Sequence, residues 1–172
     1  MPKVLEIAVP DASALLRSLK VVHFCDAYQA TLRNPKLSAQ DAYVAVFGHA
    51  PRWAKSLMKL RGVVARALGL KHVTGSNFPL VQSTSYQVGQ RVGLFSVRSV
   101  EPGELIVGDD DKHLDFRISI YRSSANGIEV VTVSTAVEIH NKIGRLYMLV
   151  VKPFHRLMAR SMVQRAVDAG RL

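Results

Sequence analysis

The chain has 172 residues, of which 48% are hydrophobic and 21% charged, and this composition excludes a disordered protein and predicts one globular domain, residues 1–172. Lys and Arg outnumber Asp and Glu by 23 to 13, which gives a formal net charge of +10. The one cysteine, Cys25, excludes an intrachain disulfide and favours a reducing compartment.

The beginning of the chain lacks the pattern of a secretory signal. Its short apolar stretch is interrupted by Glu6 and Pro10, so it has no continuous hydrophobic core. The sequence contains no uncharged apolar run of about 18 residues, the length that a transmembrane helix needs. We therefore expect a cytoplasmic protein.

The positive charge is concentrated in two segments. Residues 52–66 contain five Lys or Arg and no acid, and residues 142–171 contain seven together with one acid, Asp168. This distribution is typical of a surface that faces an anionic partner, but it also fits the solvated sides of two amphipathic helices. The sequence alone leaves both interpretations open.

A strand and a short helix are predicted first. Residues 21–32 alternate with a period of two, which indicates a strand. Cys25 belongs to this alternation, and we interpret it as a packing residue rather than a nucleophile. Ser38 is a candidate N-cap for a helix that continues through residues 42–47.

A second helix and a long loop follow. The helix begins near Pro51, carries an apolar stripe at helical spacing from Trp53 to Leu68, and stops at Gly69. Residues 71–90 are polar and rich in Ser, Thr and Gly. A loop of this length in a compact domain is typically a lid, a binding loop or a disordered segment.

Antiparallel strands are predicted in the second half of the chain. Two short strands flank a turn at Pro102-Gly103, and a longer hairpin, residues 113–140, turns at Asn126-Gly127, a strong hairpin signal. With that dipeptide as the loop, one face of the hairpin is almost wholly apolar: Leu114 faces Ile139, Phe116 faces Val137, Ile118 faces Thr135 and Ile120 faces Val133. The other face is polar: His113 faces His140, Asp115 faces Glu138, Arg117 faces Ala136 and Ser119 faces Ser134. We expect a buried apolar face and a solvated polar face.

Residues 143–169 predict a long C-terminal helix. Its apolar stripe, with steps of three and four, is formed by Ile143, Tyr147, Val150, Phe154, Leu157, Met158, Ser161 and Met162. Pro153 should bend the helix, which allows it to follow a curved sheet. We expect the stripe to be used in covering that sheet.

The order of these elements predicts an α+β fold. A strand, two short helices, an antiparallel meander and a long final helix are typical of the helix-grip, START-like fold, in which the final helix packs on a curved antiparallel β-sheet. At least five strands are evident. We expect further strands within residues 1–9 or 71–90.

Two motifs in the second half resemble a known bacterial family. The first is matched by Glu101, Pro102, Gly103 and Leu105, and the second by Gly144, Arg145, Leu146, Tyr147, Pro153, Phe154, His155, Arg156 and Met162. Over about residues 53–167 the chain is similar to the family called domain of unknown function 2867. The resemblance implies a START-like, Bet v 1-like fold and no particular activity. The family's usual Asp is replaced by Gln90, so an acidic role at that position is not expected.

The same resemblance bears on domain organisation. Many members of the family are the tail of a nucleotide-sugar-epimerase-like dehydrogenase. This chain has no Gly-rich dinucleotide fingerprint, so it resembles the stand-alone form.

Polar side chains offer only weak candidate sites. His155 has no Asp, Glu, Cys or His three or four residues away, so we interpret it as a structural histidine that bonds a nearby carbonyl. Residues 109–111, all Asp, lack the spacing of a calcium loop and predict a polar connection. The hairpin's polar face gathers zinc or iron ligand types, which we interpret as solvated charges: His113, His140, Asp115 and Glu138. We predict no catalytic residue, metal site or cofactor.

An apolar cavity between the hairpin and the final helix is the third candidate, by analogy with START-like folds. Its expected ligand-binding lining is Phe116, Ile118, Ile120, Val133, Val137, Tyr147, Phe154 and Met158. The alternative is that these side chains fill a solid core.

Three functions follow. The first is a small hydrophobic-ligand-binding module, with residues 71–90 as a lid. The second is an interaction protein whose basic helix faces bind an anionic membrane surface or an acidic partner such as a dehydrogenase; exposed aromatics are too sparse for a specific nucleic acid. The third and weakest is a START-like enzyme, which would require His113, Asp115 and Glu138 to face the cavity.

Overall fold

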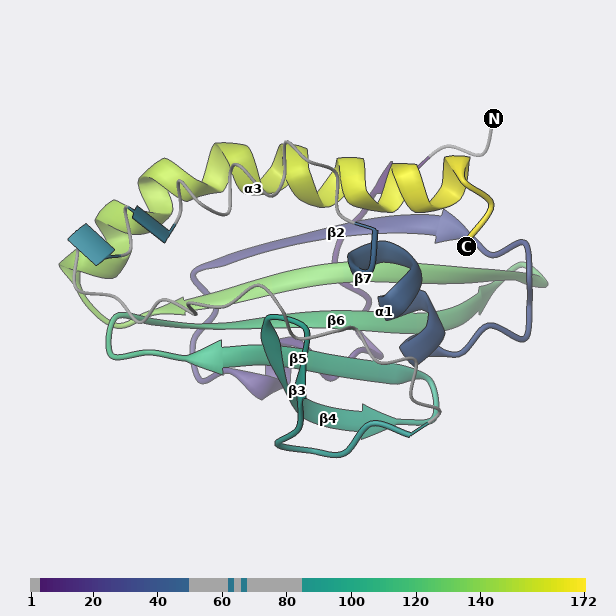
Figure 1. Ribbon diagram of the computed structural model, residues 1–172, viewed down its shortest axis with the longest axis horizontal. Helices are drawn as coiled ribbons and strands as arrows, with labels where there is room; N and C mark the ends of the chain where they lie inside the picture. Colours follow the sequence, from purple (N-terminus) through teal and green to yellow (C-terminus); the bar gives the residue numbers. More distant parts are fainter. Residues whose placement is uncertain (1–3, 50–61, 64–65, 68–84) are drawn as a thin grey trace.

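The computed structural model describes residues 4–49, 62–63, 66–67 and 85–172, and these form an α+β fold (Figure 1). Its elements are β1 (Leu5–Glu6), the 3-10 turn η1 (Leu16–Ser18), β2 (Phe24–Thr31), α1 (Ala39–Phe47), β3 (Arg91–Val92), β4 (Phe95–Glu101), β5 (Glu104–Asp110), β6 (Leu114–Ala125), β7 (Ile128–Ile139) and α3 (Lys142–Asp168). The predicted helix after Pro51 and most of the predicted loop, residues 71–84, lie outside the described residues.

The strands of the described chain form one antiparallel sheet. Their order is β1-β2-β7-β6-β5-β4-β3, so β2 pairs with β7 across about a hundred residues of sequence. The five predicted strands are confirmed. Of the two further strands, β1 lies within residues 1–9 and β3 begins directly after residue 90.

The register of the central hairpin is confirmed. Ala125 pairs with Ile128, and the pairing continues without interruption to Leu114 and Ile139. The turn residues Asn126 and Gly127 have φ values of 53° and 77°, the left-handed conformation that a two-residue loop of this type requires.

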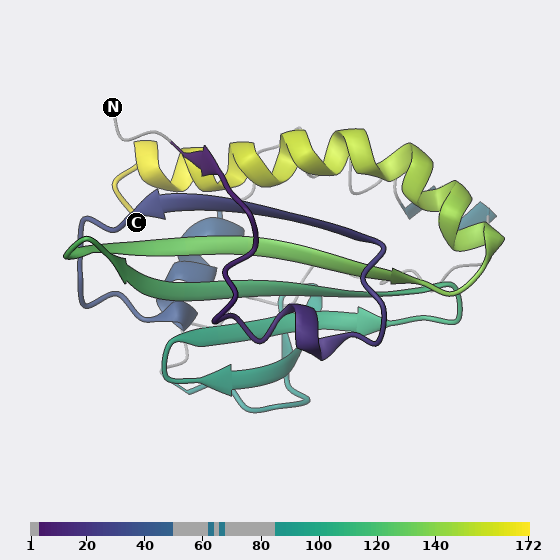
Figure 2. The same cartoon turned by 180° about the vertical axis from the view of Figure 1, so that it is seen from behind.

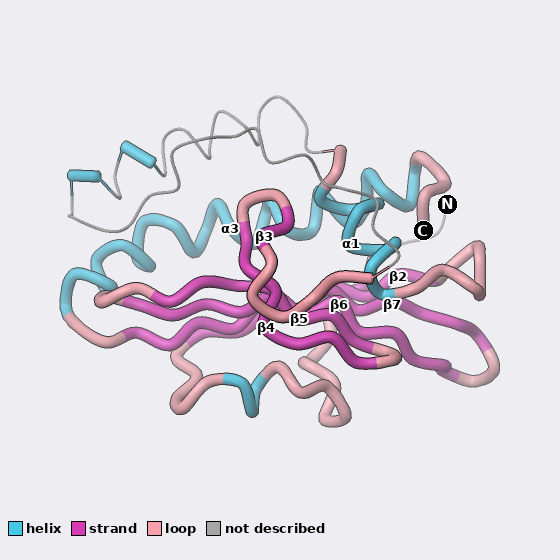
Figure 3. Tube along the Cα trace, turned by 60° about the horizontal axis from the view of Figure 1, so that its bottom comes forward, coloured by secondary structure: helices cyan, strands magenta, loops and turns pink. Residues whose placement is uncertain are grey.

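Both described helices lie on the same face of the sheet, as Figures 1 and 3 show. The N-cap of α1 is confirmed: the Ser38 hydroxyl accepts a hydrogen bond from the Asp41 amide at 3.0 Å, and the Asp41 carboxylate accepts one from the Ser38 amide at 3.2 Å. Helix α3 begins after Asn141, whose side chain caps it, and continues through Pro153. Its first turn lies so close to the sheet that a Cβ on Gly144 would be 2.3 Å from the His113 carbonyl oxygen.

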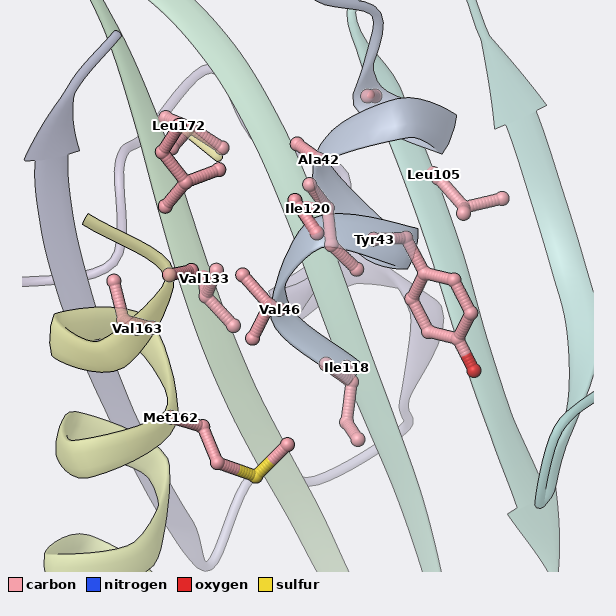
Figure 4. Close-up of a cluster of buried hydrophobic side chains, with 14 of the residues drawn as sticks. Ala42, Tyr43, Val46, Leu105, Ile118, Ile120, Val133, Met162, Val163 and Leu172 are labelled. Carbon is pink, nitrogen blue, oxygen red and sulfur yellow. The ribbon is translucent and has the colours of Figure 1, made fainter. Parts of the chain in front are cut away.

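The hydrophobic core lies where α1 and the last turns of α3 meet the sheet (Figure 4). Side chains from three separate elements interlock there: Ala42, Tyr43 and Val46 of α1, Leu105, Ile120 and Val133 of the sheet, and Met162 and Val163 of α3. Burying one such large side chain contributes about 1.5–3 kcal/mol, so this end of the molecule supplies much of the stability.

Most of the hairpin's polar face is buried, His113 and Glu138 included, while His140 is exposed as expected, and this corrects the prediction of a solvated face. The N-terminal segment, including η1, crosses this face of the sheet (Figure 2). The Glu104 carboxylate, which lies on it, accepts hydrogen bonds from the Ser13 and Ser119 hydroxyls and, at 2.8 Å, from the Ala14 amide. The Glu138 carboxylate accepts one from the Lys20 amide at 2.9 Å. The segment thus satisfies buried polar groups that would otherwise need water.

The interpretation of Cys25 as a packing residue is wrong. Its side chain is exposed, on the face of β2 that points away from the helices. Strand β1 covers only the Gln29 and Tyr28 end of β2, so the Cys25 end is an open edge of the sheet.

Among the described residues, no helix has both the length and the apolar character that are needed to cross a bilayer.

Candidate functional site

The middle of α3 is less deeply buried than its two ends. Its last turns are buried through Met162, Val163, Ala166 and Val167, and its first turns through Gly144, Tyr147 and Met148, but no residue between 149 and 161 is fully buried. An apolar pocket of about 170 Å³ lies between this part of the helix and the sheet.

Seven of the eight side chains that the sequence predicts as lining do line the pocket: Phe116, Ile118, Val133, Val137, Tyr147, Phe154 and Met158. The eighth, Ile120, is 0% exposed and belongs to the closed core beneath α1. Ile120 lies two residues beyond Ile118 on the same face of β6, which places it past the end of the pocket.

Sequence reasoning missed the aromatic wall of the pocket. Phe47 of α1 contacts Phe95 of β4 edge-to-face at 6.1 Å, and Phe95 contacts Phe116 of β6 at 5.6 Å. Edge-to-face contacts of this kind add to the stability that the rings gain from burial. Phe47 is the last residue of α1 and Phe95 is the first residue of β4, and no local periodicity indicates that the two rings meet.

A polar pair stands at the edge of this apolar pocket. His155, which lines it, places Nε2 at 3.3 and 3.4 Å from the two carboxylate oxygens of Asp26 on β2. Asp26 is 6% exposed and faces the helix, next to Thr135 in the β2–β7 register. The partner of His155 is therefore a carboxylate 129 residues away, not a nearby carbonyl as predicted.

Tyr28 extends this polar pair along β2. Its hydroxyl donates to the Asp26 carboxylate across 3.5 Å. Burial raises the pKa of the Tyr28 phenol to about 12, and the negative charges of Asp26 and Glu6 add to the shift, while Arg156 opposes it. Tyr28 therefore remains a neutral donor to Asp26 at ordinary pH.

Three nitrogen-bearing side chains of α3 surround the ring of Phe24, another lining residue. The His155 ring meets it edge-on at 5.8 Å. The Lys152 ammonium and the Arg156 guanidinium lie 5.4 and 5.7 Å from its centroid, within the range of cation–π attraction. Neither Lys152 nor Arg156 forms an ion pair with any residue that the structure describes.

The polar cluster of the hairpin lies on the opposite face of the sheet from the pocket. His140 contacts Asp115 at 3.2 Å and Glu138 at 3.9 Å, whereas His113 bonds Asn141 instead. In the described ranges, no group of three His, Cys, Asp or Glu side chains is placed to hold a metal ion. These side chains do not line the pocket, so they give no support to an enzyme with acids in its cavity.

The three acids of residues 109–111 form part of a network of charges between strands. Asp110 pairs with Arg117 at 2.6 Å and with Arg98 at 3.0 Å. Asp109 pairs with Arg91 at 3.5 Å. Asp109 and Asp110 belong to β5 and pair with β6, so the predicted polar connection holds for Asp111 alone.

The apolar stripe of α3 is not used up by the sheet, contrary to expectation. Val150 and Phe154 keep 44% and 47% exposure although they line the pocket. A second apolar row, formed by Leu146, Leu149 and Leu157, is also exposed. The helix therefore offers apolar surface both to the pocket and to its outer side.

Comparison with known proteins defines the family. A family model described as "Protein of unknown function (DUF2867)" matches residues 18–162. The chain belongs to this family. The match begins before Trp53, so the DUF2867 region includes β2 and the Asp26 side of the pocket as well as the C-terminal motif.

Other comparisons give little. One solved structure that resembles this DUF2867 chain is CalU16 from Micromonospora echinospora, at 8% identity, covering 99% of this chain and 92% of that one with a TM-score of 0.30. A likeness this low carries no argument about fold or function. No curated protein matches the chain.

Proposed function

We propose that the protein binds a small hydrophobic ligand between the sheet and the middle of α3, in a helix-grip, START-like arrangement. The observation that carries the proposal is the pocket itself, which is lined almost wholly by apolar side chains. Its volume of about 170 Å³ is close to that of engineered cavities of about 150 Å³ that take up benzene.

An apolar pocket that stays empty lowers the stability of a protein. Interiors pack as closely as organic crystals, and an unfilled apolar space costs stability because its walls lose contacts. Directly beside the pocket, and sharing Val46, Val133 and Met162 with its wall, the core is filled by interlocking side chains. A hollow beside a well-packed core, closed on one side by aromatic rings, is a feature that a ligand would fill.

The pocket has the composition of a ligand site. Small-molecule sites are mostly apolar, with a few polar groups that orient the ligand. His155 and Thr135 supply such groups here, and both lie next to Asp26. The proposal assigns ligand contact to the seven predicted lining residues together with Phe24, Phe47 and Phe95.

Titration calorimetry with propylbenzene, a neutral apolar probe, tests the proposal. We expect saturable binding of one molecule per chain. Ala159 lines the pocket from α3, so Ala159→Leu should fill part of the space and weaken binding by roughly tenfold or more. Ala169→Leu adds the same side chain at the exposed end of the helix and should bind like the unmodified protein.

The outcome is decided by that pair of variants. An absence of saturable binding, or equal binding by Ala159→Leu and Ala169→Leu, would contradict the proposal. Thermal unfolding of both variants shows whether each is folded.

The exposed outer row of α3 favours a second candidate, contact with an anionic membrane surface. Leu149 is 75% exposed and Leu157 is 62% exposed, on a helix that also carries Arg145 and Arg160. Apolar residues combined with cations on one helix are typical of interfacial helices. The protein should sediment with vesicles that contain phosphatidylglycerol at low salt. The double variant Leu149→Ser with Leu157→Ser should no longer sediment with them. If the unmodified protein stays in solution, membrane contact is excluded.

We also propose a cytoplasmic location, which the single cysteine supports because it favours a reducing compartment.

A further inference from the structure

The pocket is electrically asymmetric. On the β2 side, Lys152 and Arg156 bring two permanent positive charges within 5.4 and 5.7 Å of the Phe24 ring, which is part of the pocket wall. On the opposite side, the wall consists of the aromatic rings of Phe47, Phe95 and Phe116. Neither cation lines the pocket itself, so a ligand would reach them where it extends past the Phe24 ring, while its other end would meet an apolar surface.

The described acids nearest to these two cations do not line the pocket. Asp26 is the acid nearest to them in the sheet register, but its carboxylate is buried, bonded to His155 and Tyr28, and absent from the pocket wall. Glu6 lies opposite Tyr28, four residues further along β2 than Phe24. No described acid forms an ion pair with Lys152 or Arg156.

His155 separates Asp26 from the pocket. Its Nε2 lies 3.3 and 3.4 Å from the two oxygens of the Asp26 carboxylate. His155 lines the pocket and Asp26 does not, so the imidazole lies between the pocket and the carboxylate. An anionic group of the ligand at this side of the pocket would meet the His155 ring before it met Asp26.

We propose that the ligand is an amphipathic carboxylate, with its apolar body in the pocket and its carboxylate held at the β2 side by Lys152 and Arg156. The inference rests on the proposed function and adds the chemical class of the ligand. Charge-assisted hydrogen bonds from ammonium and guanidinium groups to carboxylates are about twice as strong as neutral ones, so these side chains would favour an acid over a neutral analogue.

The size of the pocket limits the body of this ligand. A volume of about 170 Å³ accepts one aromatic ring with a short substituent, or a short alkyl chain. An aromatic acid and a short fatty acid share the required chemistry. The probes 4-ethylbenzoate and octanoate represent these two sources.

The experiment compares each acid with its carboxamide, which has nearly the same shape and no charge. Calorimetry on the full chain should show 4-ethylbenzoate binding at least roughly tenfold more tightly than 4-ethylbenzamide, or octanoate more tightly than octanamide by the same factor. The preference should shrink with added salt, because the cations are exposed. The arm that shows the larger preference identifies the source.

A matched pair of double variants assigns the effect to particular side chains. Lys152→Gln with Arg156→Gln should reduce the acid-to-amide ratio to nearly one. Arg145→Gln with Arg160→Gln removes the same charge from the same helix at positions without a described contact to Phe24, and should leave the ratio unchanged.

Four outcomes decide the inference. A lost ratio in the first variant and a retained ratio in the second support it. Equal binding of acid and amide, or equal losses in both variants, overturn it. If propylbenzene binds and the acids do not, the carboxylate inference fails and the pocket stands. If propylbenzene does not bind either, the proposed function fails with it.

Discussion

The two ends of the sheet's helix-facing side are covered by the same helix and filled in different ways. At one end, the last turns of α3 and the side chains of α1 interlock with the sheet. Val163 and Ala166 of α3 are fully buried there. Towards the other end, beneath the middle of α3, an apolar pocket remains between the helix and the sheet. One amphipathic helix can thus serve as core at one end and as the wall of a pocket at the other.

The difference lies in what reaches between helix and sheet. Tyr43 of α1 is almost fully buried, and its hydroxyl donates to the Val92 carbonyl at 2.9 Å, which anchors α1 over the strands. At the pocket end, Phe47 and Phe95 form a wall and leave the space before them open. A closed core resists changes of side-chain volume, whereas a pocket tolerates them, and the following predictions depend on that contrast.

The largest expected effect is a difference between two truncations. Ile120→Ala creates a cavity in the closed core and should lower the free energy of unfolding by about 3 kcal/mol. Met158→Ala enlarges a space that already exists and should cost less than about 1 kcal/mol. Urea unfolding of both variants measures the contrast, and equal losses would show that the pocket end is packed as tightly as the core.

Enlarging a small residue should reverse the sign of the effect between the two ends. Ala42 is fully buried in α1, so Ala42→Leu overpacks the core and should cost about 2 kcal/mol. Ala159→Leu fills the pocket and should be neutral or stabilise the protein by up to about 1 kcal/mol. If Ala159→Leu lowered the free energy of unfolding as much as Ala42→Leu does, there would be no unfilled space beside Ala159.

The smallest expected effect concerns the pH dependence that Tyr28 contributes beside the pocket edge. Because the folded pKa of Tyr28, about 12, lies above its ordinary value of 10, the neutral phenol stabilises the fold below pH 10, and this contribution is lost as the pH rises towards 12. Asp26→Asn removes one cause of the shift and should move the tyrosinate titration of Tyr28 to lower pH.

Absorbance titration of tyrosinate follows this change, and Tyr28→Phe identifies its component of the curve. An unaltered titration in Asp26→Asn would show that Asp26 does not interact with Tyr28 as the structure indicates.

Local patterns predicted the parts of the fold that depend on neighbours in sequence. The Asn126-Gly127 turn fixed the register of β6 and β7, because a slip of one residue would exchange their faces. Ser38 and Asp41 form a capping box within four residues, and α3 follows from its own periodicity. Each of these signals lies within one element or one turn.

The remainder depends on contacts between distant segments. The N-terminal segment that covers Glu104 and Ser119 has neither helical nor strand periodicity, so the sequence did not indicate that the polar face would be buried. The contact of His155 with Asp26 requires the β2–β7 pairing, which joins strands separated by most of the chain. Seven lining residues were predictable because hairpin and helix faces are periodic, whereas the ring of Phe24 and the cations around it were not.

The most direct test of the pocket is a methyl NMR titration of the full chain with propylbenzene. The account predicts saturable shifts at Met158 and Ile118, which line the pocket, and almost none at Ile120 and Val163, which lie in the closed core. Shifts of equal size at all four methyl-bearing residues, or no saturable shift at Met158, would contradict it.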